Sequence, residues 1–219
     1  MTTDTLSQRQ LYYQITRSDH DALRSRLSAG TASASAGCVH RMFFASYRAR
    51  MEALPLEELL LPGREETRFL LQYLDNDPSY LTLERWRDER RTSSMVTEAE
   101  CRALLSGETD WLRERHDPVL LDFYEGITER MLLPRALFSY RRELYAPEGT
   151  GCWVALDTDL RSSMEHMDFL DPRRLAADTA EQEGRILMAI GYTDFIPDHV
   201  LCLLEEAAPK RKLLGRRKQ

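Results

Sequence analysis

Two segments in the second half of the chain decide the fold: Leu133-Pro-Arg-Ala-Leu-Phe-Ser-Tyr-Arg-Arg-Glu-Leu-Tyr145 and Gly151-Cys-Trp-Val-Ala-Leu-Asp-Thr-Asp-Leu-Arg161. Apolar and polar side chains alternate along both segments. This alternation is typical of strands, which place successive side chains on opposite faces of a sheet. We therefore expect these residues to form a β-hairpin.

Length and composition are those of an ordinary globular protein. The chain has 219 residues, of which 42% are hydrophobic and 30% are charged, which is enough for one sizeable core or at most two small ones. The net charge of −6 disfavours a nucleic-acid-binding surface, because such surfaces are usually basic. A protein of this charge that encloses a polyanion needs its positive charge concentrated locally.

Several sequence patterns that would indicate a cellular location or a type of active site are absent. The sequence has no basic and apolar N-terminal signal pattern and no apolar run of membrane-spanning length, so we expect a cytoplasmic protein without a transmembrane segment. No P-loop, G-x-S-x-G or H-E-x-x-H motif occurs. The cysteines are too dispersed for a zinc site, and we expect free, buried thiols: Cys38, Cys101, Cys152 and Cys202.

The other elements follow from hydrophobic periodicity and capping signals. Further strands are expected at residues 9–16, 39–45, 67–74, 80–87 and 185–192, and helices at 18–28, 47–54, from 97, at 117–131 and at 197–207. Ser18 or Asp19 is the expected cap of the first helix, and Thr97 with Glu100 forms a capping box for the third. Polar loops are expected at 31–37 and 168–183. The mixed order predicts an α+β domain with a largely antiparallel sheet.

The hairpin wording also resembles a known family. The pattern Tyr140-x-Arg142-Glu143, followed by Leu156-Asp157 and the rest of V-x-L-D-x-D-L-R, is similar to the VTC domain, the polyphosphate polymerase domain of the vacuolar transporter chaperone complex and its bacterial relatives. Phe195-Ile-Pro-Asp before the last helix resembles the ending of that domain. The likeness extends from about residue 11 to 207 and suggests a divergent, bacterial-type member at 8–208 with a basic tail at 209–219.

The resemblance implies a β tunnel or barrel with flanking helices, the fold of the triphosphate tunnel superfamily. In such a barrel, side chains at alternate strand positions line the interior. Family members use arginine and lysine there to hold a nucleotide triphosphate and a growing phosphate chain. A glutamate on the last strand holds Mn²⁺ or Mg²⁺ against the phosphates.

Few of these charged positions are retained here. The resemblance leaves Arg68, Glu84, Arg91 and Arg142 as candidate phosphate-site residues. Other tunnel-lining positions carry substitutions: Gln10, Tyr12, Leu70, Gln72, Trp86, Asp88, Trp153, Ala189 and Gly191. Ala189 stands at the position of the metal-binding glutamate, so we expect no catalytic residue, no metal and no other cofactor. Arg41, Arg85 and Arg87 are candidates to replace lost cations.

Each candidate also has a structural interpretation. Arg142 is expected either to hold phosphate or to form an ion pair with Glu143 or a strand neighbour. Glu84 is expected either to belong to the phosphate site or to form an ion pair with Arg91 or Arg142. Asp157 and Asp159, with Arg161, favour a role at the hairpin end over metal binding. The two tryptophans either fill volume left by long cations or offer a stacking surface: Trp86 and Trp153.

Loss of one transition-state cation costs about 2–4 kcal/mol, so the loss of several predicts a non-catalytic partner or regulatory protein, for example beside a catalytic VTC-like paralogue. Three alternatives remain: a polyphosphate- or phosphate-binding module, a residual polyphosphate polymerase, and a tunnel enzyme for a less charged, ring-bearing substrate. The basic residues at 210–218 are either a frayed end or a contact for polyphosphate or another acidic surface.

Overall fold

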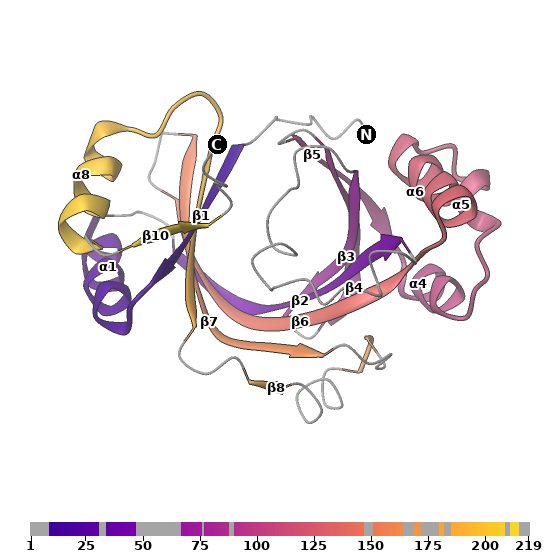
Figure 1. The fold of residues 1–219 in the computed structure, drawn as a ribbon, viewed down its shortest axis with the longest axis horizontal. Helices are drawn as coiled ribbons and strands as arrows, with labels where there is room; N and C mark the ends of the chain where they lie inside the picture. The colour runs from indigo at the N-terminus through magenta and orange to yellow at the C-terminus, as the bar shows by residue number, and fades with distance from the viewer. Residues whose placement is uncertain are drawn as a thin grey trace. The chain divides into compact units, whose positions relative to one another are not determined.

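The structure is a computed structural model that describes residues 9–30, 34–46, 67–75, 77–87, 90–146, 151–163, 169–171, 180–181, 185–208 and 211–214. Its strands form a 10-stranded sheet in the order β10-β1-β9-β7-β6-β2-β3-β4-β5, with β8 (Ala180–Glu181) paired to β7. The strand pairs whose registers lie within the described residues are antiparallel. The α+β class and the largely antiparallel sheet predicted from the sequence are confirmed (Figure 1).

The chain divides into two compact units, which are described in turn. Unit 1 comprises Met1–Gly37, Tyr140–Leu160 and Glu181–Gln219, and unit 2 comprises Cys38–Ser139 and Arg161–Ala180. The two-residue strand β8 contributes one residue to each unit, and three longer strands also contribute residues to both: β2 (Ala34–Ser46), β6 (Leu132–Tyr145) and β7 (Cys152–Ser163). The hairpin predicted first is formed by the last two of these, which are neighbours in the sheet.

Unit 1 packs two helices against one face of its strands. Strand β9 (Ile186–Tyr192) lies between β1 (Arg9–Ile15) and β7. Alternate residues of these strands point toward α1 (Arg17–Gly30) and α8 (Asp198–Ala207) and form an apolar core. Burial of such a face supplies most of the free energy that holds a helix on a sheet.

The first helix begins earlier than the sequence suggested. Thr16 accepts a hydrogen bond through Oγ1 from the backbone N–H of Asp19 (3.2 Å), and the Asp19 carboxylate accepts one from the N–H of Thr16 (3.2 Å). This reciprocal arrangement is a capping box. The cap is therefore Thr16 and not Ser18 or Asp19, because a threonine with an acid three residues later satisfies two free N–H groups at once.

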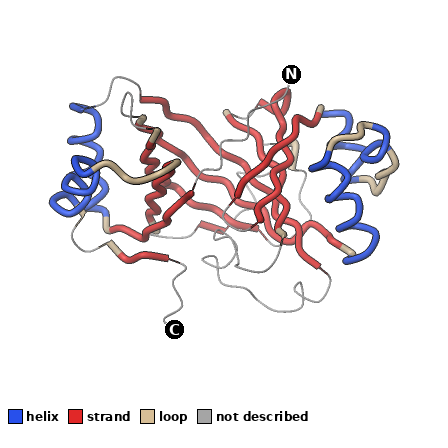
Figure 2. The backbone as a smooth tube through the Cα atoms, turned by 90° about the horizontal axis from the view of Figure 1, so that it is seen from above, coloured by secondary structure: helices blue, strands red, loops and turns tan. Residues whose placement is uncertain are grey.

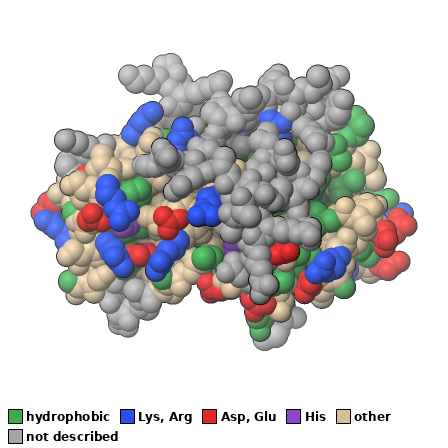
Figure 3. Space-filling view, turned by 90° about the horizontal axis from the view of Figure 1, so that it is seen from below, with side chains coloured by type: hydrophobic (Ala, Val, Ile, Leu, Met, Phe, Trp, Pro, Cys, Tyr) green, Lys and Arg blue, Asp and Glu red, His purple; other side chains and the backbone are tan. Residues whose placement is uncertain are grey.

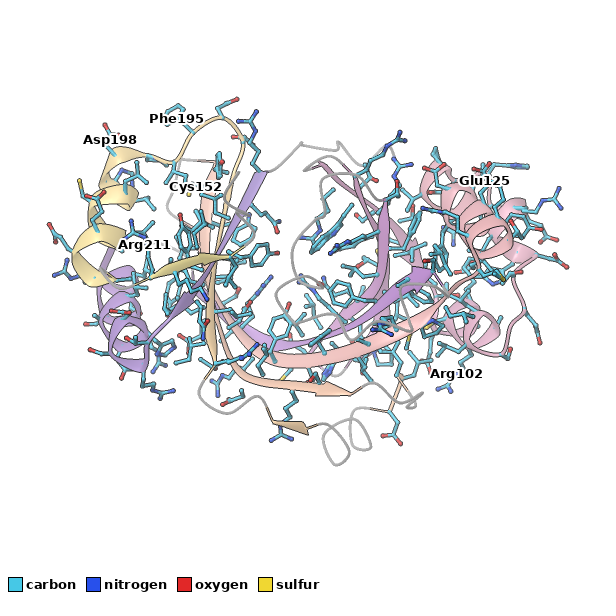
Figure 4. All side chains as sticks on the ribbon, viewed as in Figure 1. Arg102, Glu125, Cys152, Phe195, Asp198 and Arg211 are labelled. Atoms are coloured by element: carbon cyan, nitrogen blue, oxygen red, sulfur yellow. The ribbon has the colours of Figure 1, made fainter. Side chains whose placement is uncertain are left out.

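The described part of the basic tail is bound to unit 1 and is not frayed. Lys212–Leu214 forms β10, which pairs with β1. Arg211 donates from Nη1 to the carbonyl oxygens of Leu204 (3.1 Å) and Ala208 (3.0 Å) at the end of α8, and it lies beside that helix in Figure 4. A cation at this position is favourable because helix C-terminal carbonyls carry partial negative charge. The other tail residues, 209–210 and 215–219, lie outside the described residues.

Unit 2 packs its helices against one face of an antiparallel meander. The strands β3 (Arg68–Leu74), β4 (Asp77–Arg87) and β5 (Arg90–Val96) follow β2 in the sheet. Helices α4 (Glu98–Leu105), α5 (Trp111–Glu114) and α6 (Pro118–Arg130) follow in the chain. In Figures 1 and 2 the three helices gather on one side of these strands, where Phe69, Leu71, Leu83 and Phe123 are among the buried core residues.

The capping signals of unit 2 are confirmed. Thr97 and Glu100 form the predicted capping box at α4. Asp117 accepts hydrogen bonds from the N–H groups of Val119 and Leu120 at the start of α6, with Pro118 at the first helical position.

Strand β5 was missed because its sequence, RRTSSMV, lacks an apolar alternation. Its buried side includes Ser94, whose hydroxyl donates to the Asp117 carboxylate that caps α6 (2.5 Å). A small polar residue thus occupies a core-facing position because a helix cap lies opposite it. The predicted loop at 31–37 is partly wrong, since β2 begins at Ala34. The predicted helix at 47–54 and most of the loop at 168–183 lie outside the described residues.

The four cysteines are free, as predicted, although only Cys101 and Cys152 are buried. Burial raises the pKa of the Cys101 thiol to about 12, so this thiol stays protonated and packs as a small apolar group. Cys38 is half-buried and Cys202 is exposed. Among the described residues, no helix has the length and apolar character needed to cross a membrane.

Met131 follows α6 in the left-handed conformation (φ 50°), and its side chain is 60% exposed. Side chains with a Cβ are strained there, whereas glycine is not. We predict that Met131→Gly stabilises the protein by about 0.5–1 kcal/mol, measured by chemical denaturation. Met131→Ala removes the same exposed side chain but keeps the strain, so it is the control. An equal gain in both variants would contradict this account.

Candidate functional site

Unit 2 places the predicted site residues on the sheet face opposite its helices, which we call far face 2. The antiparallel registers align this face in rows across the strands. One row contains Arg41, Gln72 and Thr82, and the next contains Phe43, Leu70, Glu84 and Ser93. A third row contains Arg68, Trp86 and Arg91. The alternation predicted for residues 68–72 and 84–86 is therefore correct, and Asp88 lies outside the described residues.

Glu84 is the centre of a charged group on far face 2, which we call the Glu84 cluster: Arg41, Gln72, Glu84, Trp86 and Arg91. The Glu84 side chain accepts a hydrogen bond on Oε1 from Nη2 of Arg91 and one on Oε2 from Nε1 of Trp86 (3.0 Å). Arg41 donates from Nε to Oε1 of Gln72 (2.6 Å). Of the two interpretations of Glu84, the structure contains the ion pair with Arg91.

Three members of the cluster are buried, whereas the Arg91 side chain is 27% exposed. Arg41 is 1% exposed, Glu84 3% and Trp86 4%. Burial alone would raise the pKa of Glu84, and it is the largest single influence. The charges of Arg91 and Arg41, with the hydrogen bonds from Arg91 and Trp86, outweigh it and hold the pKa of Glu84 below its ordinary value. Glu84 is therefore a carboxylate stabilised by surrounding donors.

Trp86 is packed, so its ring is not open to a ligand base. The guanidinium carbons of Arg41 and Arg91 lie 6.0 and 5.8 Å from its ring centroid. Phe43 meets the same ring edge-on, with centroids 6.3 Å apart. These contacts favour volume filling and cation–π packing over the stacking interpretation.

Arg41 is the candidate replacement cation that reaches this face. It lies in a row with Gln72, a position at which the sequence resemblance implies an arginine. Arg85 points to the helix side and pairs with Asp122 of α6. Arg87 has the same strand parity as Arg85 and is exposed. The register of β2 was the missing information, because the sequence does not specify which residue of β2 faces Gln72.

Unit 1 places the remaining predicted residues on its own sheet face opposite the helices, which we call far face 1. One row across the strands contains Gln10, Gly191 and Trp153. The next contains Tyr12, Ala189 and Ala155. The hydroxyl of Tyr12 donates to Oε1 of Gln10 (2.7 Å). The substituted positions of unit 1 therefore share one sheet face. That this face lines a tunnel stays a prediction.

The ring of Trp153 fills the space of the missing side chain at Gly191. A Cβ built on Gly191 would lie 2.0 Å from Cε2 of Trp153 and 2.3 Å from two further ring atoms. Two long cations are expected at these positions from the family resemblance, and one indole ring now covers both. The volume-filling interpretation of Trp153 agrees with this contact.

Arg142 is paired across the hairpin with Asp157, and not with the adjacent Glu143. Its Nε and Nη2 donate to the two carboxylate oxygens of Asp157, each at 2.7 Å. Burial alone would lower the pKa of Arg142, but the Asp157 carboxylate raises it well above its ordinary value. The Arg142 guanidinium also lies 5.3 Å from the centroid of the Tyr140 ring. Bidentate pairing of this kind neutralises the arginine and fixes its orientation.

The two far faces therefore differ in charge. Among the described side chains, far face 2 carries Arg41, Arg68 and Arg91 against Glu84, an excess of positive charge. On far face 1 the half-buried Arg142 is balanced by the buried Asp157. In the coloured parts of Figure 3, basic and acidic side chains lie beside one another. Within the described ranges, no three histidine, cysteine or carboxylate side chains come together as a metal site.

No protein-family model matches the sequence, and no curated protein resembles it significantly. Solved structures do resemble it. A protein from Hippeastrum, provisionally named an adenylyl cyclase and described as having a dominant triphosphatase activity, aligns over 96% of this chain and 92% of its own with a TM-score of 0.56 and 12% identity. A protein of similar provisional name from Bacillus halodurans aligns over 91% and 88% with a TM-score of 0.49 and 13% identity.

At 12% identity the similarity to the Hippeastrum protein shows the fold alone. The chain has an α+β fold of the triphosphate tunnel type, as the sequence predicted. The narrower assignment to the VTC domain stays a prediction.

The contact between Trp153 and Gly191 makes a direct prediction. Gly191→Ala forces a Cβ into the indole ring, and we expect a loss of about 1–3 kcal/mol, as for other overpacked interiors, measured by chemical denaturation. In a Trp153→Ala background the same substitution should cost much less, because the ring is gone. Equal costs in the two backgrounds would show that the contact is not the cause.

The lowered pKa of Glu84 predicts a pH dependence of stability. Because the folded-state pKa lies below the ordinary value of 4.5, the stabilisation is complete above about pH 4.5 and is lost as pH falls through the folded-state pKa. Glu84→Gln should therefore be less stable than the wild type at pH 7, and the difference should shrink on acidification. Denaturation midpoints between pH 7 and 3 measure it. A difference that grows toward pH 3 would contradict the assignment.

Proposed function

We propose that this protein is a non-catalytic, VTC-like domain of the triphosphate tunnel type that acts as a partner or regulatory protein. The observation that carries the proposal is far face 1. Where the resemblance implies a metal carboxylate and long cations, the face carries Ala189, Gly191 and Trp153, and the ring of Trp153 occupies the space of residue 191.

Phosphoryl transfer depends on positioned positive charge, since the protein's main task is to stabilise charge on the phosphates. Arg142 is the arginine of far face 1 that matches the family pattern. Its Nε and Nη2 both donate hydrogen bonds to the Asp157 carboxylate. Its charge is engaged within the protein. This arrangement supports a structural role for a strand face that is functional in catalytic members of the family.

Phosphate binding is the second candidate function, and far face 2 favours it. Three arginines from three strands share that face with one glutamate: Arg41, Arg68 and Arg91 with Glu84. Arginine forks match phosphate oxygens well. The triphosphatase activity described for the Hippeastrum protein is consistent with a phosphate ligand for this fold. We therefore propose that the domain binds polyphosphate or another phosphate chain without transforming it.

The proposed biological role is that of an accessory subunit. A domain that keeps a phosphate-binding face but lacks the catalytic one would complement a catalytic VTC-like paralogue, as the resemblance implies. Basic residues at 216–218 would add attraction for polyphosphate or an acidic surface. Residual polymerase activity, or turnover of a ring-bearing substrate, would contradict this proposal.

Purified protein with Mn²⁺ and ATP, or with Mn²⁺ and tripolyphosphate, is expected to release no phosphate and to form no polymer above background. Tripolyphosphate alone is expected to raise the melting temperature, and the rise should fall steeply with added salt. Turnover at an enzymatic rate would refute the non-catalytic role. The absence of any stabilisation at low salt would refute the phosphate-binding role.

Two matched variants locate the binding site. Arg68→Gln removes a cation from far face 2 and should weaken tripolyphosphate binding about tenfold, the effect of one charge-assisted hydrogen bond. Arg87→Gln removes an exposed arginine of opposite strand parity on β4, and binding should stay within about twofold. Calorimetric titration measures both. Equal losses in the two variants would mean that the attraction is diffuse.

A further inference from the structure

The position of Glu84 carries an inference about selectivity at the proposed phosphate site, and it rests on that proposed function. A carboxylate at the centre of the Glu84 cluster is bound by donors that would suit a phosphate equally well. Its Oε1 accepts from Arg91, its Oε2 accepts from the indole N–H of Trp86, and the charge of Arg41 also acts on it. The side chain is 3% exposed.

We propose that Glu84 is an internal anion that occupies Arg91 on far face 2, so that only a ligand with several phosphate groups competes effectively for this arginine. Glu84 then sets the selectivity of the site for phosphate chains over single phosphates. The ligand class is a linear oligophosphate, and the discriminating residue is Glu84.

The argument is one of competing charges. An incoming oxyanion must share Arg91 with a carboxylate that already holds it, and it also meets the repulsion of that carboxylate. Inorganic phosphate brings at most two negative charges at neutral pH. Its attraction to Arg91 is largely offset by the repulsion from the Glu84 carboxylate. A chain of three phosphates is longer and also reaches Arg68, which lies in the same row as Arg91. The chain thereby gains the attraction of a second arginine, with which Glu84 does not pair.

A purely structural role for Glu84 makes a different prediction. If Glu84 served only to orient Trp86 and Arg91, its replacement would loosen the site and weaken every ligand alike. Glutamine keeps the size of the side chain and one oxygen acceptor for these donors but removes the negative charge. Glu84→Gln therefore separates the charge from the packing.

The experiment compares phosphate, pyrophosphate and tripolyphosphate by calorimetric titration of the full chain at constant ionic strength. In Glu84→Gln we expect phosphate and pyrophosphate to bind about tenfold more tightly. Tripolyphosphate should gain less, so that its preference over phosphate falls. Equal gains for all three ligands, no gain, or a uniform loss would overturn the selectivity role.

Asp157→Asn in unit 1 is the matched control. It also removes a buried carboxylate charge from an arginine pair, here with Arg142, but it lies on far face 1. We expect no change in the preference among the three ligands. The same change as in Glu84→Gln would show that net charge alone is responsible, and it would overturn the assignment to Glu84.

Loss of a buried ion-pair partner can prevent folding, so Glu84→Asp is the second variant. Aspartate keeps the charge but withdraws it by one methylene from Arg91, and the preference for tripolyphosphate should lie between those of the wild type and the glutamine variant. An unchanged preference in a folded Glu84→Asp would overturn the proposal. If the wild type binds none of the three ligands, the proposed phosphate function fails first, whatever the variants do.

Discussion

The alternation of side chains along antiparallel strands is the constraint on which the structure depends. Each strand must supply an apolar face to its helices, and whatever remains is presented on the opposite side. In β4, Leu83 enters the helix-side core while Glu84 and Trp86 belong to the other face. A one-residue shift of register would bury the charges among the helices and expose the core. The apolar core therefore fixes where every charge on the far faces stands.

Much of this arrangement was predictable from local sequence signals. The hairpin, the strands at Arg68–Leu74 and Ile186–Tyr192 and the caps at Thr97 and Asp117 all follow from patterns a few residues long. Strand β5 was not predictable, because its polar residues are buried by partners distant in sequence. The same limit applies to the site. Parity along a strand identified which residues share a face, whereas the pairing of Arg142 with Asp157 and the inclusion of Arg41 depend on registers between strands.

The two far faces illustrate two ways in which a protein accommodates buried charge. On far face 1 a single arginine meets a single carboxylate in a bidentate pair, so the interaction is complete within the protein. On far face 2 the arginines outnumber the glutamate among the described side chains, and two of them approach the ring of Trp86. Buried ion pairs contribute little net stability compared with apolar packing. The two faces therefore differ in how much of their positive charge is neutralised by carboxylates among the described residues.

The close fit of Trp153 on Gly191 also limits how this lineage can change. A lysine or any other side chain at residue 191 would collide with the indole ring as long as Trp153 remains. Replacing Trp153 first would leave a void beside a residue that has no side chain to fill it. Either single step is disfavoured, so a long side chain at residue 191 requires both substitutions together. Such a pair of positions can change only in concert, which makes each of them resistant to single mutations.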